Sequence, residues 1–388
     1  MTTSTALLTD RYELTMLAAA LRDGTASRPS VFELFSRRLS GGRRFGVVAG
    51  TGRLLTLLRE FRFGDDELRF LRDNDVVDAE SLTYLENYRF TGSIRGYREG
   101  ELYFPGSPIL TVEGSFADAV VLETLALSVL NHDSAVATAA SRMSIAAGER
   151  PLAEMGSRRA AEQSAVAAAR AAYIAGFRAT SNLEAGRRWG IPTMGTAAHS
   201  WTLLHETEEE AFRSQIDSLG TDTTLLVDTY DIRTGVETAI RVAGTGLGGV
   251  RIDSGDLPIV AAEVRAQLDE LGATGTRITV TSDLDEYAIA ALAASPVDAY
   301  GVGTSVVTGS GYPTASMVYK LVARQDPSGA WIGVAKASTD KASHGGRKAA
   351  FRTLVDGVAE AETVVVSDGF EELDTPAEHA DGRALQTL

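Results

Sequence analysis

The chain has 388 residues and a formal net charge of −15, because 37 Lys and Arg residues face 52 Asp and Glu residues. It contains no cysteine, which excludes disulfides, zinc–thiolate sites, iron–sulfur clusters and thiol nucleophiles. The acidic balance argues against a nucleic-acid partner, and no apolar run has the length of a membrane span or the flanks of a signal peptide. We therefore expect a soluble, cytoplasmic protein with neither nucleic-acid nor membrane partners.

Residues 1–140 show a mixed pattern of helices and strands. The predicted elements are a helix over 12–23, a strand over 31–35, a basic Gly-rich loop over 37–46, a helix over 51–61, short β-like runs within 95–112, and helices over 117–130 and 134–147. We interpret this segment as the first part of an α/β domain.

Residues 141–316 follow a different rhythm, in which short apolar runs alternate with helical stretches. The runs cover 152–156, 177–182, 191–198, 223–229, 249–254, 277–282 and 299–303. Alternation of this kind predicts βα units around a parallel sheet. An irregular (β/α) barrel is the architecture that we favour, and an open doubly wound sheet is the alternative.

Residues 317–388 return to a mixed pattern. Strands are expected over 317–322 and 331–334, and 336–348 is a polar, basic loop. We expect this C-terminal segment to complete the α/β domain begun by residues 1–140, with the barrel of 141–316 inserted between the two parts.

Polar residues end several of the apolar runs of the middle segment. Asp228, Asp253, Asp283 and Gly303 follow one another at intervals of 20 to 30 residues, which is the length of one βα unit. The carboxyl ends of parallel strands share one face of a barrel, so these residues should converge there. Converging carboxylates suit Mg²⁺ or the hydroxyl groups of a ribose, although Asp228 or Asp283 could simply cap the next helix.

Two arginine-bearing segments indicate an anionic ligand. Arg251 and Asp253 are two residues apart on a predicted strand, so both side chains lie on the same face. They are either a structural ion pair or an anion-binding Arg beside a functional carboxylate. Arg158 and Arg159 stand at a strand–helix junction, where the helix dipole disfavours cations and a bound anion would explain them.

A Gly-rich turn at Tyr300–Ser305 (YGVGTS) is the predicted phosphate loop. Gly301 and Gly303 allow backbone N–H groups to approach a phosphate, and Thr304 adds a hydroxyl donor. The segment is not a Walker A motif, and a plain structural turn is the alternative. A lone histidine is more often a surface or core residue than a catalyst, but His199 also ends an apolar run, which strengthens the case for a functional role.

The combination of motifs resembles the nicotinate phosphoribosyltransferase family. The resemblance is carried by seven segments in the family's order, spread over nearly the whole chain: Thr9–Met16 (TDRYELTM), Glu154–Arg159 (EMGSRR), Thr180–Asn182 (TSN), Gly195–Ser200 (GTAAHS), Val227–Asp231 (VDTYD), Arg251–Asp256 (RIDSGD) and Tyr300–Thr304 (YGVGT). Met155 departs from the Phe that relatives carry before this glycine.

This resemblance implies an irregular α/β barrel beside an α/β domain made from both chain ends, in a homodimer with active sites at the interface. The implied reaction joins nicotinate to 5-phosphoribosyl 1-diphosphate (PRPP), giving nicotinate mononucleotide and diphosphate in NAD biosynthesis or salvage. Mg²⁺ is the implied cofactor, and hydrolysis of ATP, a co-substrate, is coupled to the transfer.

The resemblance also assigns roles to individual residues. His199 would be transiently phosphorylated, and Asp228 and Asp253 would serve the ribose and the metal. The implied nicotinate-binding residues are Tyr12, contributed by the partner subunit, with Met155, Arg158, Ser181 and Arg251. The implied PRPP-binding residues are Arg37, Gly255, Ser282, Asp283, Gly301, Gly303, Thr304, Lys336 and Arg347. Ser181 favours nicotinate, because relatives that use nicotinamide carry an Asp there that would repel a carboxylate.

Two other functions stay open at this point. Quinolinate phosphoribosyltransferase shares the barrel, but its dicarboxylate substrate needs more cations, and it has no use for a phosphorylated histidine. A non-catalytic phosphate or nucleotide sensor could keep the same barrel, although the intact set of His, Asp and Arg residues argues for turnover.

Overall fold

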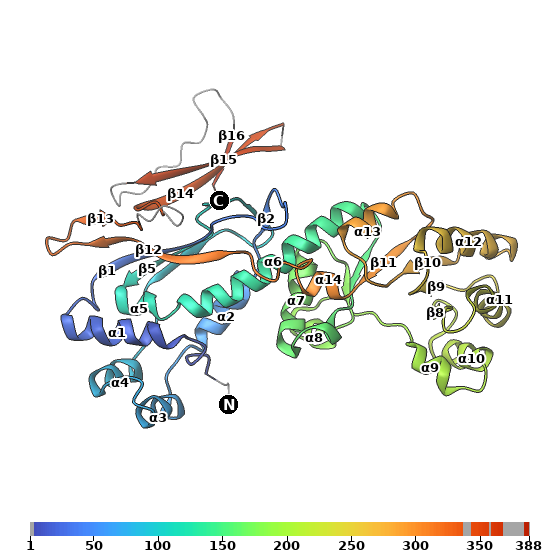
Figure 1. Cartoon of the computed structure of the whole chain (residues 1–388), viewed down its shortest axis with the longest axis horizontal. Helices are drawn as coiled ribbons and strands as arrows, with labels where there is room; N and C mark the ends of the chain where they lie inside the picture. The colour runs from blue at the N-terminus through green and yellow to red at the C-terminus, as the bar shows by residue number, and fades with distance from the viewer. Residues whose placement is uncertain (1–3, 337–342, 357, 368–383, 388) are drawn as a thin grey trace. The chain divides into compact units, whose positions relative to one another are not determined.

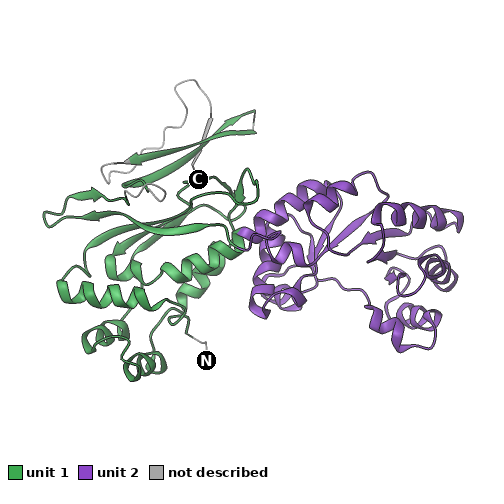
Figure 2. Cartoon of the chain, in the orientation of Figure 1, with its two compact units in different colours: residues 1–134, 314–388 green, residues 135–313 purple. Residues whose placement is uncertain are grey.

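The computed structural model describes residues 4–336, 343–356, 358–367 and 384–387. The chain divides into two compact units, drawn in Figures 1 and 2. Unit 1 combines residues 1–134 with 314–388, and unit 2 comprises residues 135–313. Part of the predicted basic loop, residues 337–342, lies outside the described residues.

The main sheet of unit 1 joins the two ends of the chain. Its five antiparallel strands follow the order β13-β12-β1-β5-β3. They are β1 (Pro29–Ser36), β3 (Ser93–Gly96), β5 (Leu110–Ser115), β12 (Met317–Gln325) and β13 (Trp331–Gly333). The central strand β1 is rich in aromatic and β-branched residues, and all of it except Pro29 is buried. Pairing of β1 with β12 explains why the C-terminal segment belongs to this unit.

Helices pack on this sheet through apolar faces. Those of unit 1 are α1 (Arg11–Asp23), α2 (Thr51–Arg59), α3 (Asp65–Asp73), α4 (Ala79–Glu86) and α5 (Phe116–Val120). In α1, Leu14, Leu17 and Ala20 are buried at helical spacing, as the sequence pattern predicts. Helices α3 and α4 are absent from the sequence-based prediction.

A smaller sheet of unit 1 is formed by β14 (Arg347–Val355), β15 (Val358–Ser367) and β16 (Ala384–Thr387), in the order β15-β14-β16. A further two-stranded pair consists of β2 (Gly46–Val47) and β4 (Leu102–Tyr103). Arg347 therefore begins a strand and does not belong to the loop predicted over 336–348.

Unit 2 contains a parallel sheet whose strand order is nearly cyclic. The order β7-β6-β11-β10-β9-β8 pairs the first strand of the unit with the last. The strands are β6 (Leu152–Glu154), β7 (Ala179–Thr180), β8 (Thr224–Leu226), β9 (Gly249–Ile252), β10 (Arg277–Val280) and β11 (Ala299–Val302). Such an order describes a partial barrel that is open between β7 and β8, and it gives all six strand ends one common face.

Helices follow the strands of unit 2 along the chain. They are η1 (Ser157–Arg159), α7 (Glu162–Ile174), α8 (Leu183–Trp189), α9 (His199–Leu204), α10 (Glu208–Leu219), α11 (Ile232–Ala243), α12 (Leu257–Glu270), α13 (Glu286–Ala291) and α14 (Thr304–Val307). The alternation of strands and helices predicted from the sequence is confirmed.

The third predicted strand, over 191–198, is wrong. This segment makes a single parallel bridge, Thr180 to Thr193, and no ladder. Pro192 has no N–H to donate, and Gly195 weakens a strand, so the segment crosses the open part of the sheet as extended chain. It ends at His199, the first residue of α9.

The predicted break between two helices near residue 131 is also wrong, because α6 (Glu123–Ala147) runs through it. Polar residues at the predicted break make tertiary contacts. Asn131 accepts a hydrogen bond from the backbone N–H of Met317 at 2.8 Å, and Asp133 pairs with Arg53 at 2.9 Å. The chain breaks earlier instead, after the short helix α5, whose first turn is capped by Ser115.

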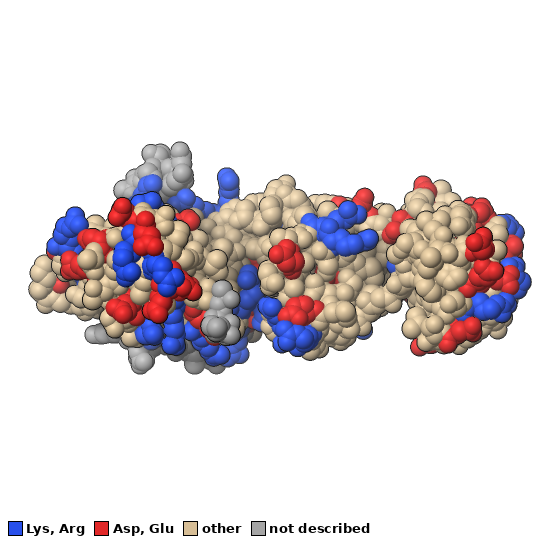
Figure 3. Space-filling model, turned by 90° about the horizontal axis from the view of Figure 1, so that it is seen from below, with Lys and Arg blue, Asp and Glu red and all other residues tan. Residues whose placement is uncertain are grey.

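On the face of the molecule drawn in Figure 3, Lys and Arg side chains are interspersed with Asp and Glu side chains. Several oppositely charged side chains of the protein form ion pairs. Glu209 of α10 pairs with Arg213 of the same helix and with Arg241 of α11.

Within the described residues, no helix combines the length and apolarity that crossing a membrane requires.

Candidate active site

A polar cavity of about 260 Å³ lies at the carboxyl ends of four strands of unit 2. It is lined by Met155, Arg158, Arg159, Arg251, Asp253, Thr281, Ser282, Asp283, Gly301, Gly303 and Thr304. The lining residues come from β6, β9, β10 and β11 and from the turns that follow these strands. The structure thus brings together most of the predicted site residues of unit 2, along with Arg159 and Thr281.

The cationic side of the cavity is formed by three arginines. Arg251 donates a hydrogen bond to Thr196 Oγ1, yet its Nε is buried and has no hydrogen-bond partner among the described residues. Burial lowers the pKa of Arg251, and the neighbouring Arg158 lowers it further, whereas Asp253 and Asp228 raise it. A buried guanidinium donor without a partner is costly, so this side of the cavity is suited to an anion.

Asp228 and Asp253 lie at neighbouring strand ends and interact through the backbone. Asp228 Oδ2 accepts hydrogen bonds from the N–H of Asp253 at 2.8 Å and from Ser254 Oγ at 2.7 Å. Its Oδ1 is buried and has no partner in the described part of the chain. Asp253 Oδ1 accepts from Thr281 Oγ1. Asp228 therefore holds the turn that carries Asp253 and still offers one oxygen to a ligand.

These two carboxylates were also the predicted Mg²⁺ ligands. Among the described residues, no group of three His, Asp or Glu side chains is arranged to hold a metal ion by itself. Mg²⁺ commonly takes only one or two protein carboxylates together with water and substrate phosphates. The free Oδ1 of Asp228 beside Asp253 fits an ion of that kind, carried in with a phosphorylated substrate.

The Gly-rich turn after β11 is shaped by close contacts with the turn after β6. A Cβ atom on Gly301 would lie 2.7 Å from Met155 Sδ and 2.6 Å from Thr281 Cγ2, so glycine is required there. Ser282, in the turn that follows the neighbouring strand β10, has a φ of +122°, a conformation that non-glycine residues rarely adopt. Strained backbone of this sort gathers at sites where N–H groups must face a ligand.

His199 is half-buried and does not line the cavity. Its Nδ1 lies 3.2 Å from Thr229 Oγ1, and Thr229 directly follows Asp228. The imidazole is therefore oriented by the same turn that carries the Asp228 carboxylate.

Three further predicted residues of unit 2 also lie outside the cavity lining, and one of them is Asp228. Gly255 is in the turn between Asp253 and α12, and Ser181 is exposed after β7, where its N–H donates to the carbonyl of Glu154 at 2.8 Å. Ser181 is thus held at the strand end next to Met155.

The other predicted residues belong to unit 1. Tyr12 is 45% exposed on α1. Arg37 has a buried Nε without a partner among the described residues, which suits an anion. Lys336 is exposed, and Arg347 pairs with Glu113 at 2.9 Å. Arg347 is therefore already engaged by a carboxylate.

Glu208 is a candidate functional residue that sequence reasoning missed. Burial raises its pKa to about 7, with further contributions from Asp231 and Asp228. Its Oε1 is buried without a partner in the described part of the chain. In the sequence, Glu208 opens a run of three glutamates behind a Thr cap, which is typical of a solvated helix start. Glu208 differs from the neighbouring glutamates only because the turn that follows β8 lies close to it.

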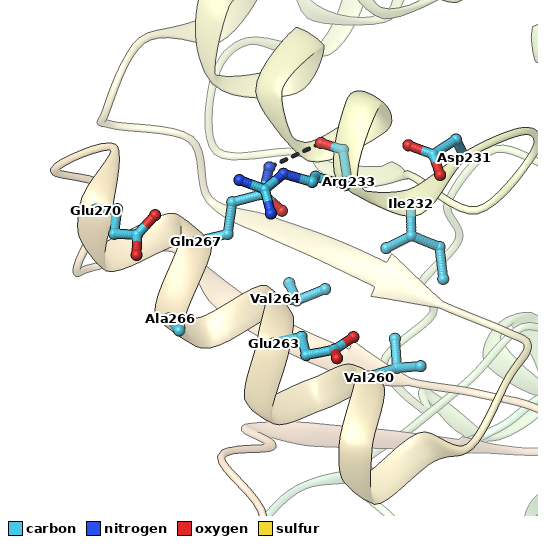
Figure 4. A pocket seen from close by; sticks show the side chains of 9 residues that line it. All are labelled: Asp231, Ile232, Arg233, Val260, Glu263, Val264, Ala266, Gln267 and Glu270. Carbon is cyan, nitrogen blue, oxygen red and sulfur yellow. Dashed lines mark hydrogen bonds between the residues drawn. The ribbon is translucent and has the colours of Figure 1, made fainter.

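A second cavity, of about 430 Å³, lies between α11 and α12 and is shown in Figure 4. Asp231, Arg233, Glu263 and Glu270 line it together with valine and isoleucine side chains. Gln267 Nε2 crosses it to the carbonyl of Arg233 at 2.8 Å. Asp231 caps α11 by accepting from the N–H of Thr234, so the helix cap explains why this carboxylate stands beside the cavity.

Comparisons with known proteins identify the relatives of this chain. A model of the nicotinate phosphoribosyltransferase N-terminal domain matches residues 7–131. The chain is 61% identical over 354 residues to nicotinate phosphoribosyltransferase pncB1 of Mycobacterium tuberculosis, covering 89% of this chain and 78% of that protein. It is 38% identical over 362 residues to nicotinate phosphoribosyltransferase of Bacillus subtilis, covering 90% and 74%.

A solved structure agrees with these relatives. The crystal structure of human nicotinic acid phosphoribosyltransferase superimposes with a TM-score of 0.79 at 28% sequence identity, covering 98% of this chain and 86% of that one. The resemblance seen in the seven sequence motifs is thereby confirmed. This chain belongs to the nicotinate phosphoribosyltransferase family.

Proposed function

We propose that this protein is a nicotinate phosphoribosyltransferase of NAD salvage, joining nicotinate to PRPP and releasing nicotinate mononucleotide and diphosphate. The observation that carries the proposal is the cavity at the strand ends of unit 2, where three arginines, the carboxylates of Asp253 and Asp283 and a Gly-rich turn converge. This set of groups suits a substrate that combines phosphates, a ribose and an aromatic anion.

The cavity supports a division of labour for PRPP. Gly301, Gly303 and Thr304 would take the 5′-phosphate, assisted by Ser282 and Asp283 across the cavity. Asp253 would face the ribose. As the bond from the anomeric carbon to diphosphate breaks and the bond to the pyridine nitrogen forms, positive charge develops on the sugar, and a fixed carboxylate stabilises it.

The leaving diphosphate is the most negatively charged group in the reaction, so it needs cationic side chains around it. Arg37 and Lys336 of unit 1 stay candidates for it, whereas Arg347 would first have to leave Glu113. Gly255 would contribute backbone N–H near Asp253. Mg²⁺ held by Asp228 and Asp253 would neutralise charge on the diphosphate and so make it a better leaving group.

Nicotinate is a flat aromatic anion, and the residues around Met155 match both properties. The Met155 thioether would pack against the ring, and Arg158 and Arg251 would bind the carboxylate. Ser181 brings no charge that would repel that carboxylate. Tyr12, exposed on α1, is the aromatic residue that we propose the partner subunit contributes. The homodimer and a cytoplasmic location stay predictions.

We further propose that His199 couples ATP hydrolysis to the transfer. The terminal phosphoryl group would move from ATP to an imidazole nitrogen with release of ADP, and water would later remove it as phosphate. The contact with Thr229 would orient the ring for this step. Phosphohistidine formed in the presence of radiolabelled ATP, and lost in the H199N variant, would support the assignment.

The proposal is tested by measuring product from PRPP and Mg²⁺ with nicotinate, nicotinamide or quinolinate, each with and without ATP. We expect nicotinate mononucleotide from nicotinate, formed faster with ATP and accompanied by ADP. Product from quinolinate alone, with release of carbon dioxide, would retain the fold and overturn the function. No product from any base would favour a non-catalytic sensor.

A further inference from the structure

A buried carboxylate behind the cavity has no role in the reaction as described so far. Glu154, the last residue of β6, has no solvent exposure. Its Oε2 accepts from Thr180 Oγ1 at 2.6 Å, and its Oε1 accepts from the N–H of Gly156. Both donors are neutral, and burial raises the pKa of Glu154. Burying a carboxylate among neutral donors is costly, so an apolar residue would stabilise the fold more simply.

The hydrogen bonds of Glu154 extend into a closed network that joins two strand ends. Thr180 Oγ1, which donates to Glu154, also accepts from the N–H of Asn182 at 3.0 Å. Asn182 Nδ2 donates to Ser157 Oγ at 2.9 Å, which leads back to the turn that follows Glu154. We call Glu154, Gly156, Ser157, Thr180 and Asn182 the Glu154 network.

The Glu154 network lies next to the residues that we expect to bind the base. The turn over 155–159 supplies Met155 and Arg158 to the cavity, and its N–H at Gly156 is held by Glu154. On the other side, Ser181 is fixed because its N–H donates to the Glu154 carbonyl at 2.8 Å. The network therefore sets the separation between the cationic turn and Ser181.

The turn packs closely against the segment that carries the phosphate loop. A Cβ atom on Gly156 would lie 2.3 Å from Val307 Cγ1 and 2.8 Å from the carbonyl oxygen of Gly303. Gly156 is thus pressed against the turn that bears the phosphate loop. A shift of this turn toward the phosphate loop is blocked by that packing, and a shift away from Glu154 breaks the hydrogen bond from the Gly156 N–H.

We propose that the Glu154 network is a positioning device that determines affinity for the base and the choice between nicotinate and its uncharged amide. It rests on the proposed function, since it presumes that Arg158 and Ser181 face the pyridine substituent. A carboxylate is required because both of its oxygens must accept. A glutamine would present its NH₂ group to one of the two donors and break the network there.

The sharpest test compares two variants of one residue, Thr180→Val and Thr180→Ser. Valine has nearly the shape of threonine but removes the hydroxyl that links Glu154 to Asn182, whereas serine keeps it. We expect T180V to raise KM for nicotinate about tenfold, with kcat and KM for PRPP changed by less than about twofold. The preference for nicotinate over nicotinamide should fall, and T180S should behave as the unaltered enzyme.

Two further measurements keep the test decisive. Ser157→Ala removes only the bond from Asn182 and should produce a smaller change of the same kind even if T180V folds poorly. Calorimetric titration with nicotinate in the absence of PRPP reports base affinity independently of turnover. Glu154→Gln should weaken that binding as T180V does.

Several results would overturn the inference. Equal nicotinate affinity in T180V and T180S would show that the network only stabilises the fold. A parallel rise of KM for PRPP would show that it supports the whole cavity rather than the base. If the unaltered enzyme forms no product from nicotinate, the proposed function fails instead, which the assay of the unaltered enzyme reveals separately.

Discussion

The two units of this protein treat buried charge in opposite ways. In unit 1, several buried charged groups are paired with one another: Glu33 with Lys348 at 2.9 Å, Asp133 with Arg53 at 2.9 Å, and Glu362 with Arg352 at 3.2 Å. Glu13 is a counterexample, because the partners of its carboxylate are the neutral Thr9 and Thr124. In unit 2, three charged groups at or beside the strand ends keep a buried atom without a hydrogen-bond partner among the described residues, whereas both carboxylate oxygens of Glu154 are bonded. These atoms are Asp228 Oδ1, Glu208 Oε1 and Arg251 Nε.

This difference separates structural charge from functional charge. A buried pair with both partners present holds two segments together, as Lys348 of β14 holds Glu33 of β1. A buried polar atom without a partner destabilises the free protein, and it persists where a ligand completes its hydrogen bonds. Arg37 Nε is also buried without a hydrogen-bond partner among the described residues, although it lies in unit 1, and it is one of the residues that we predict to bind PRPP.

The largest effect that the comparison predicts is on catalysis. Asp253→Asn keeps the shape of the side chain and its acceptor for Thr281 but removes the negative charge that we propose faces the ribose. We expect kcat to fall roughly 10²- to 10³-fold, the range found when a preorganised electrostatic group is removed. The free energy of unfolding should change little. A loss of stability as large as that from breaking a buried ion pair would show that Asp253 is a structural charge instead.

The matching experiment in unit 1 removes one member of a buried pair. Lys348→Met leaves Glu33 buried and uncompensated, which should lower the free energy of unfolding by about 3–5 kcal/mol in urea titrations. The double variant E33L/K348M should recover most of that loss, because two apolar groups of similar size need no counter-charge. A double variant as unstable as the single one would contradict the assignment of this pair as structural.

A smaller effect is expected at the phosphate loop. Gly301→Ala places a methyl group against Met155 and Thr281, so the two turns must separate by several tenths of an ångström. We expect KM for PRPP to rise about tenfold, measured by initial rates at saturating nicotinate. Gly246→Ala is the matched control, since nothing lies within 4 Å of its Cβ position. Equal effects of both variants would argue against close packing at this turn.

The smallest effect concerns pH. The pKa of Glu208 is about 7 in the folded protein, above its value in the unfolded chain, so the folded state holds the proton more tightly. Stability should therefore decline as pH rises from about 4.5 to 7 and level off above. Glu208→Gln removes the decline and should be about 1 kcal/mol more stable than the unaltered protein at pH 8, after allowance for solvent screening.

Thermal or urea unfolding at pH 5 and pH 8 checks this prediction. Glu209→Gln is the control, because Glu209 is on the same turn of α10 but pairs with Arg213 and Arg241, which lower its pKa. The same pH dependence in both variants would show that the proximity of Glu208 to Asp228 has no consequence.

Much of the site could be predicted from single strands. An apolar run followed by Asp228 or Asp253 marks a strand end, and parallel strands bring such ends to one face, so the residues converge without further information. The turn at Gly301 was predictable for the same reason. Segment 191–198 was not, because its short apolar run matches a strand while Pro192 and Gly195 prevent a ladder.

The sequence by itself determined which chemistry-bearing residues stand at strand ends and which family the chain resembles, because periodicity and motif order are local properties. Only the tertiary structure decided which buried charges are paired and which are not. Glu154 and Glu208 look like ordinary acidic residues in the sequence. Segments distant in the chain fold against them and determine how far each is buried. Those segments also decide that Glu154 has hydrogen-bond partners and that one oxygen of Glu208 has none among the described residues.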